Sequence, residues 1–141
     1  PLDRRCPVVL SAGEAELRAL RGALDIDATS SPARERALRE ALGIAGVVLH
    51  DEAAAVAATD SRLGAGTSTV PNIRSGAMTR RTGAGDRFTG GLAHGLGAGL
   101  DAPVAMALGN ACATHFVSTG ETGSRAGLVR FLRSVPLPDD G

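Results

Sequence analysis

Two short apolar runs in the sequence, residues 6–10 (CPVVL) and 45–50 (AGVVLH), are separated by two segments with helical spacing. The first segment, residues 11–24, repeats leucine at helical intervals. The second, residues 32–42, opens with a proline and is followed by a glycine, which are typical helix boundaries. Continuous apolar runs suit strands buried on both faces, and strands that alternate with helices are typical of a layered parallel sheet. We therefore expect an α/β fold of three layers, α/β/α, with a mostly parallel sheet.

The rest of the chain continues the alternation of strands and helices. Residues 53–59 (AAAVAAT) suit either a strand or a helix, because their periodicity does not distinguish the two. Residues 67–73 (TSTVPNI) predict an outer strand, since the proline favours an edge position. Helical spacing begins at residue 84, Asp101 is expected to cap a further helix, and residues 125–135 predict a last one. The helix after Asp101 is expected to place one stripe on a single face: Val104, Leu108, Ala111, Cys112, His115 and Phe116.

Composition narrows the possible functions without naming one. The chain has 141 residues, 43% of them hydrophobic, which is ordinary for one globular domain with its own core. Its 15 basic and 15 acidic residues cancel, so neither nucleic acid nor an anionic membrane is favoured as a partner. No apolar run approaches the length that crosses a bilayer. Cys6 and Cys112 lie far apart in apolar surroundings, and we expect buried free thiols and a cytoplasmic location.

The stretch RRTGAGDRFTGG places Gly83, Ala84, Gly85 and Asp86 at the start of a predicted helix. The first N–H groups of a helix have no partner within it, and small residues let a phosphate approach them. A carboxylate beside such an anion hole can take a proton from an attacking hydroxyl group during phosphoryl transfer. The structural alternative is a tight turn followed by a favourable acid in the first helical turn. The sequence contains no GxxxxGK[ST] motif, which excludes a P-loop protein of the usual kind.

Residues 82–113, which include TGAGDRFTGG and GNACA, resemble the C-terminal signature of the ribokinase-like, PfkB-type carbohydrate kinases. Residues 10–17 (LSAGEAEL) are similar to the family's N-x-x-E element, which helps to organise magnesium through bound water; by this resemblance Glu14 is the metal-site acid. The resemblance covers nearly the whole chain but only the C-terminal half of the family. It implies that the N-terminal sugar-binding half and the lid are absent, and that the chain is part of something longer.

Three departures from the family pattern bear on the site. Ser11 stands where the family usually has Asn, which weakens the magnesium element. Arg80 replaces an acid that helps relatives to hold a monovalent cation, and we expect its guanidinium to supply that positive charge. Residues 49–54 (LHDEAA) lack the glycines with which ATP-using relatives contact phosphates. ADP-dependent relatives often have a histidine here, so His50 is a candidate nucleotide-binding residue and the donor is ATP or ADP.

The resemblance also points to residues for the nucleotide base. Asn110 and Gly123 are the expected adenine-pocket residues, from the helix that contains GNACA and from the loop after it. Asn110 has a structural alternative as a helix residue with local hydrogen bonds, and Gly123 has one as a turn glycine. The three histidines share no metal-ligand spacing, so we expect them to be structural with respect to zinc.

The function that we predict is phosphoryl transfer from a nucleotide to a hydroxyl group of a sugar or sugar-like molecule. Asp86 is the expected base, the amides of residues 83–85 the anion hole, and Mg²⁺ with ATP (or ADP) the donor. The alternative is a domain derived from such a kinase that binds nucleotide, or serves a structural role, without catalysis. The sequence does not identify the sugar, and a homodimer is an open alternative.

Overall fold

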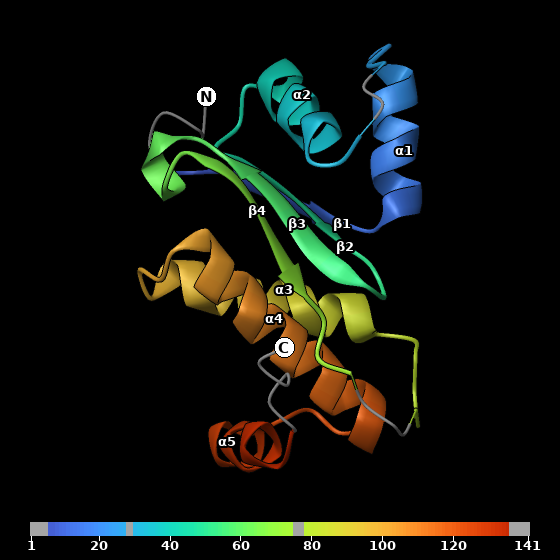
Figure 1. Ribbon diagram of the computed structural model, residues 1–141, viewed down its shortest axis with the longest axis vertical. Helices are drawn as coiled ribbons and strands as arrows, with labels where there is room; N and C mark the ends of the chain where they lie inside the picture. Colours follow the sequence, from blue (N-terminus) through green and yellow to red (C-terminus); the bar gives the residue numbers. More distant parts are fainter. Residues whose placement is uncertain (1–5, 28–29, 75–77, 136–141) are drawn as a thin grey trace, which may run out of the picture.

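The computed structural model describes residues 6–27, 30–74 and 78–135, and its helices and strands alternate as expected (Figure 1). The first part contains β1 (Val9–Ala12), α1 (Glu14–Ala23), α2 (Ala33–Leu42), β2 (Gly46–His50), β3 (Ala54–Thr59), the short 3₁₀ helix η2 (Ser61–Leu63) and β4 (Gly66–Pro71). Three helices follow: α3 (Ala84–Gly97), α4 (Ala102–Thr119) and α5 (Arg125–Ser134). Within the described residues, no helix combines the length and the apolar character that a membrane crossing requires.

The four strands form one sheet in the order β1-β2-β3-β4, and most of its pairing is antiparallel. Only β1 and β2, which are joined through α1 and α2, pair in parallel; β2 with β3 and β3 with β4 pair antiparallel. The expectation of a mostly parallel sheet is therefore wrong. The reason is the short connection at residues 51–53: a tight hairpin reverses the chain, whereas a parallel pair needs a long crossover.

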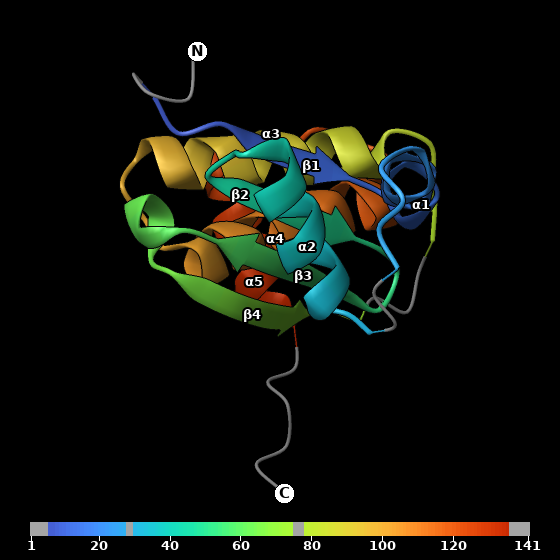
Figure 2. The same cartoon turned by 90° about the horizontal axis from the view of Figure 1, so that it is seen from above.

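Helices cover both faces of the sheet and give it two separate cores. Figures 1 and 2 show α1 and α2 on one face, with α3 and α4 on the other. Val47 and Leu49 pack with Leu17 and Leu38 on the α1–α2 face, while Val48 between them packs with the α3–α4 face. Because side chains alternate along a strand, a run that is buried on both faces supplies both cores, as the apolar pattern predicted.

Helices α3 and α4 pack closely because small residues face each other. A Cβ atom added at Gly91 would lie 2.9 Å from the Cα of Gly109, so the two backbones are almost in contact. The stripe expected on α4 is only partly correct, since Val104 is 49% exposed while Ala105 and Met106, which were not in it, are fully buried. A Cβ atom added at Gly95 would lie 2.9 Å from the Cβ atom of Ala105, so the side of α4 that carries this buried alanine faces α3.

Several local signals gave the expected structure. Gly43 ends α2 in the left-handed conformation, with φ at 63°. The carboxylate of Asp101 accepts the N–H of Val104 at 3.1 Å and caps α4. Strand β4 is an edge strand and mostly exposed. The cysteine expectation is partly wrong: both thiols are free, but Cys6 is exposed and Cys112 half-buried.

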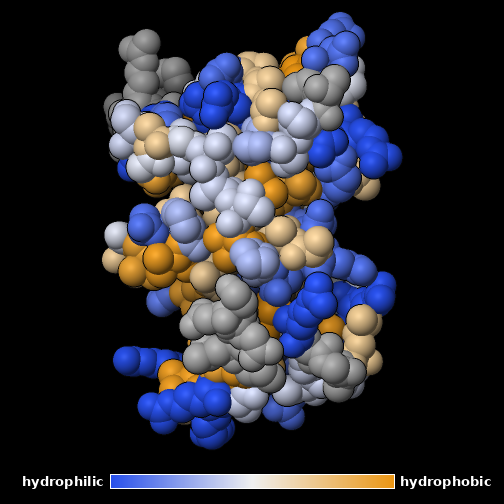
Figure 3. Space-filling model, in the orientation of Figure 1, coloured by the Kyte–Doolittle hydropathy of each residue, from blue (hydrophilic) through white to orange (hydrophobic). Residues whose placement is uncertain are grey.

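An apolar hollow of about 360 Å³ lies between β4, α4 and α5. Figure 3 shows hydrophobic residues at the surface in the middle of the molecule. Leu100, Val104 and Leu132 line the hollow, and each is more than 40% exposed.

Candidate functional site

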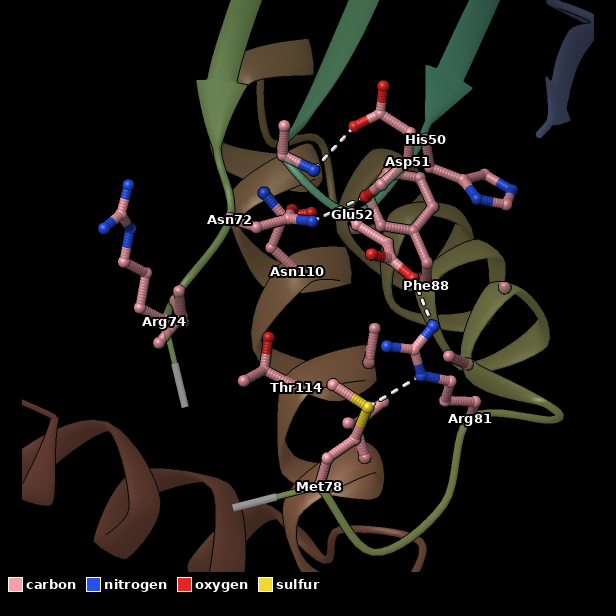
Figure 4. A pocket seen from close by; sticks show the side chains of 16 residues that line it. His50, Asp51, Glu52, Asn72, Arg74, Met78, Arg81, Phe88, Asn110 and Thr114 are labelled. Carbon is pink, nitrogen blue, oxygen red and sulfur yellow. Dashed lines mark hydrogen bonds and ion pairs between the residues drawn. The ribbon is translucent and has the colours of Figure 1, made fainter. Parts of the chain in front are cut away.

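A cavity of about 610 Å³ lies where the β2–β3 hairpin, the segment after β4, the start of α3 and the middle of α4 meet (Figure 4). This is the end of the sheet at which β2 and β4 finish. Of the residues predicted for the site, four line the cavity: His50, Ala84, Gly85 and Asn110.

The start of α3 forms one wall of the cavity. Gly83 precedes the helix with φ at +96°, a conformation that favours glycine. Ala84 and Gly85 follow as the first helical residues and face the cavity. The N–H of Ala84 donates to the carbonyl of Arg81 at 3.1 Å, while the N–H groups of Gly85 and Asp86 have no backbone partner among the described residues. Two amides of this first turn are thus available to an anion.

Asp86 lies in the first turn of α3, directly after the cavity-lining Gly85. Its side chain is exposed, and no described residue bonds to its carboxylate. The carboxylate is therefore open to solvent and to a bound molecule. Neither Asp86 nor Gly83 is among the residues that line the cavity, and the roles of Asp86 as a base and of residues 83–85 as an anion hole stay predictions.

His50 ends β2 and is in close contact with the start of α3. A Cβ atom added at Gly85 would lie 3.0 Å from the Cε1 atom of His50, so a larger residue there would require the ring to shift. On its other side the ring packs against Phe88, with centroids 4.9 Å apart. Burial lowers the pKa of His50 below its usual value, although the nearby charges of Glu16 and Asp51 act in the opposite direction. The ring thus lies against Gly85 at the start of α3, and burial disfavours its protonation.

The Asp51 side chain satisfies two amides of the hairpin after His50. The Oδ1 atom of Asp51 accepts the N–H groups of Ala53 at 2.7 Å and Ala54 at 2.9 Å. Asn72, after β4, donates its Nδ2 to the Asp51 carbonyl at 2.6 Å and ties the hairpin to the next strand. These hairpin amides therefore do not face a ligand. In the sequence, the only sign that this hairpin differs from that of ATP-using relatives was the absence of glycine from residues 49–54.

An ion pair that the sequence did not predict spans the cavity mouth. The Nη1 atom of Arg81 lies 2.8 Å from Oε1 of Glu52, and Figure 4 shows the two side chains pointing toward each other. The Nε atom of Arg81 donates to the sulfur of Met78 at 2.8 Å. The pair joins two loops that are 29 residues apart in the sequence, and spacing in the sequence does not predict such a contact.

Asn110 is a buried residue of α4 that lines the cavity. Its Nδ2 atom donates to the carbonyls of Val70 at 3.3 Å and Pro71 at 3.2 Å, so it joins α4 to the edge strand. The alternative of local bonding within the helix is wrong, because both partners lie about 40 residues earlier. The role of Asn110 in an adenine contact stays a prediction.

Gly123 lies outside the cavity, in the turn between α4 and α5. A Cβ atom added there would lie 2.8 Å from the Cγ atom of Leu128 and 3.3 Å from Nδ1 of His115. Close packing therefore accounts for a glycine at this position. Its role in the adenine pocket stays a prediction.

Glu14 is the first residue of α1 and belongs to a cluster of charges on the other face of the sheet. Its Oε1 atom lies 2.9 Å from Arg21 and 3.6 Å from both Arg18 and Arg34. In the described part of the chain, no three His, Cys, Asp or Glu residues gather into a metal site. Three guanidinium groups around one carboxylate do not fit a direct Mg²⁺ ligand, so we derive no step through the metal. A role through bound water stays a prediction.

Arg80 lies beside the start of α3 with its guanidinium over the ring of Phe116, 5.5 Å from the centroid. Arg87 approaches the same ring at 5.0 Å. The ring also contacts Gly83, where an added Cβ would lie 3.4 Å from its Cε1 atom. Two positive charges thus lie close to the turn that leads into α3.

The sequence matches a family model described as prokaryotic ketohexokinase over residues 1–134. A search among curated proteins gives no match. The fold is similar to ribokinase from Thermotoga maritima (TM-score 0.74, 20% identity), covering 89% of this chain and 42% of that one. Aminoimidazole riboside kinase from Salmonella enterica gives a TM-score of 0.69 at 25% identity, with the same coverage. An E. coli protein assigned as ribokinase II, in complex with ATP and Mg²⁺, gives 0.64 at 21% identity, covering 89% of this chain and 39% of that one. The chain thus spans about two fifths of these structures.

Proposed function

The chain belongs to the prokaryotic ketohexokinase family, and we propose that it is the nucleotide-binding, catalytic part of a kinase that phosphorylates a hydroxyl group of a sugar or sugar-like molecule. The relationship to ribokinase-like, PfkB-type kinases that the sequence predicted is confirmed by this match and by the similar structures. Catalysis by this chain, its donor and its acceptor belong to the proposal, since the chain covers less than half of those structures.

The observation that supports the proposal most is the pair of free amides beside the free carboxylate of Asp86. Gly85 places its N–H at the cavity wall, where a phosphate oxygen can accept it. The positive end of the α3 dipole adds to this attraction. Gly83 and Ala84 are too small to block the approach, which is the requirement that the motif predicted.

In the proposed reaction, the terminal phosphate of the nucleotide binds at the start of α3 and the acceptor hydroxyl lies between it and Asp86. The carboxylate takes the hydroxyl proton as the oxygen attacks phosphorus in line with the leaving group. Mg²⁺ accompanies ATP in the similar E. coli structure, and a metal-bound donor belongs to the proposal on that ground alone, without a metal ligand assigned in this chain. ATP is the proposed donor, with ADP as the alternative that His50 leaves open.

The test is an Asp86→Asn variant of the full-length protein, assayed on a panel of sugars with ATP and with ADP. Loss of the base should lower turnover about 10²- to 10⁴-fold while nucleotide affinity stays within the range of the wild type. Asp101→Asn is the matched control, because asparagine caps a helix about as well as aspartate. Turnover that survives in Asp86→Asn would contradict the proposed role.

A domain that binds nucleotide without catalysis is the second candidate. It is favoured by the β2–β3 hairpin, in which the amides of Ala53 and Ala54 bond to Asp51 instead of facing a ligand. Titration with ATP and ADP, followed by the sugar panel, separates the two: this candidate binds nucleotide and phosphorylates nothing. A cytoplasmic location, a homodimer and the absence of nucleic-acid partners remain predictions.

A further inference from the structure

We propose that Arg81 binds the polyphosphate chain of the nucleotide by leaving Glu52, so that this ion pair sets how strongly the site prefers phosphorylated ligands. The inference rests on the proposed function, because it takes the cavity at the start of α3 to be the nucleotide site. It concerns two residues that the sequence motifs did not single out.

Arg81 is held where a phosphate at the α3 amides would meet its side chain. Its carbonyl accepts the N–H of Ala84, so its backbone is part of the turn that starts the helix. Its guanidinium lines the same cavity as Ala84 and Gly85. The sulfur of Met78 accepts the Nε–H, and Nη1 donates to Glu52 across the mouth, as Figure 4 shows.

The two acids of the hairpin differ in how they are used. The Asp51 carboxylate accepts two backbone N–H groups within the hairpin and is not free to exchange partners. The Glu52 carboxylate bonds to Arg81 alone among the described residues. Unpaired, Glu52 would repel an incoming phosphate at the cavity mouth; paired, its charge is neutralised and Arg81 is kept in place.

Exchange of partner is favourable because the existing pair is exposed. The Arg81 side chain is 65% exposed and that of Glu52 84%, and ion pairs this exposed contribute little to stability. A guanidinium fork matches phosphate oxygens with two parallel hydrogen bonds, and a polyphosphate has more negative charge than one carboxylate. The other cation lining the cavity, Arg74, lies across it from Arg81 in Figure 4. Of these two arginines, Arg81 is the one whose backbone belongs to the turn that starts α3.

The experiment measures binding of adenosine, ADP and ATP to the full-length protein by calorimetry for the wild type, Arg81→Gln, Arg81→Lys and Glu52→Gln. Arg81→Gln should weaken ATP binding about tenfold or more and leave adenosine binding unchanged, because only the phosphates lose a charged partner. Arg81→Lys should recover part of the loss. Glu52→Gln should strengthen ATP binding by up to about fivefold, since Arg81 no longer has to leave a carboxylate.

Arg62 and Asp60 provide a matched control pair. They form another ion pair, with Arg62 exposed and Asp60 partly buried, at the opposite end of β3 and β4 from the cavity. Arg62→Gln and Asp60→Asn should leave the affinities for all three ligands unchanged. An equal loss in Arg62→Gln would show a general effect of net charge and overturn the proposal.

Other outcomes are equally decisive. If Arg81→Gln weakens adenosine and ATP equally, or if Glu52→Gln weakens ATP binding as Arg81→Gln does, the pair only supports the local structure and the proposal is wrong. If the wild type binds ATP and Arg81→Gln binds it with the same affinity, this inference is wrong, while the proposed function is unaffected. A wild-type protein that binds no nucleotide would overturn both.

Discussion

Replacing Gly91 with alanine should destabilise the protein, whereas the same replacement at Gly90, its neighbour in α3, should stabilise it. The two positions differ in what a Cβ atom would meet. At Gly90 it would meet nothing within 4 Å; at Gly91 it would lie 2.9 Å from Cα of Gly109 and 3.0 Å from the carbonyl oxygen of Leu108. Both contacts at Gly91 are with the backbone of α4, which cannot move aside as a flexible side chain can.

The magnitude follows from two opposing effects. Removing a glycine from a helix interior stabilises by about 0.5–1 kcal/mol at either position, because the unfolded chain loses conformational freedom. Overpacking at Gly91 costs about 1–3 kcal/mol, since α3 and α4 must separate. Gly90→Ala should therefore gain about 0.5–1 kcal/mol, and Gly91→Ala should show a net loss of up to about 2.5 kcal/mol. The difference between the two variants is the overpacking cost alone.

Urea denaturation of both variants and the wild type measures this difference as a shift in midpoint at constant slope. Because α3 carries the residues of the proposed phosphate site, Gly91→Ala should also lower nucleotide affinity while Gly90→Ala does not. If Gly91→Ala proves as stable as Gly90→Ala, the close approach of the two helices is not real and the explanation fails.

Three further predictions concern the site. Because burial lowers the pKa of His50, the unfolded chain takes up a proton that the folded chain does not, so the free energy of unfolding should fall as the pH decreases through 6.5. His50→Gln should show a smaller fall, and an identical pH profile would contradict this. Asn110→Ala should lose about 1–3 kcal/mol in a denaturation experiment, because two strand carbonyls lose their donor; an unchanged midpoint would show that they find other partners. If the Arg80 guanidinium replaces a monovalent cation, turnover by the full-length protein should be equal in potassium and tetramethylammonium chloride, and a potassium requirement would refute this.

Local chemistry predicted most helix boundaries. The α3 start at Ala84, the Asp101 cap and the Gly43 end each depend on a few neighbouring residues, so their signals are readable in sequence. The relative direction of the strands could not be predicted in the same way. Residues 53–59 are almost all alanine and valine, which leaves no periodicity, and the hairpin before them contains no glycine. Its turn is stabilised instead by the Asp51 carboxylate.

The sequence predicted several residues that line the cavity, but it did not predict the contacts that these residues make with distant parts of the chain. Ala84, Gly85 and His50 meet in the cavity because the end of β2 lies against the start of α3. The bond from Asn110 to β4 and the pair of Arg81 with Glu52 join parts of the chain that only folding brings together. Exposed long side chains have many rotamers, so their partners do not follow from spacing.

The two cores have a consequence for how the protein can change over time. Residues predicted for phosphoryl transfer lie on the α3–α4 face, while the α1–α2 face holds its own core with Leu17 and Leu38. Substitutions in separate clusters without shared partners usually have additive effects on stability. A destabilising change near the cavity that alters the acceptor can therefore be offset by a stabilising change in α1 or α2, which leaves the specificity of the site free to diverge.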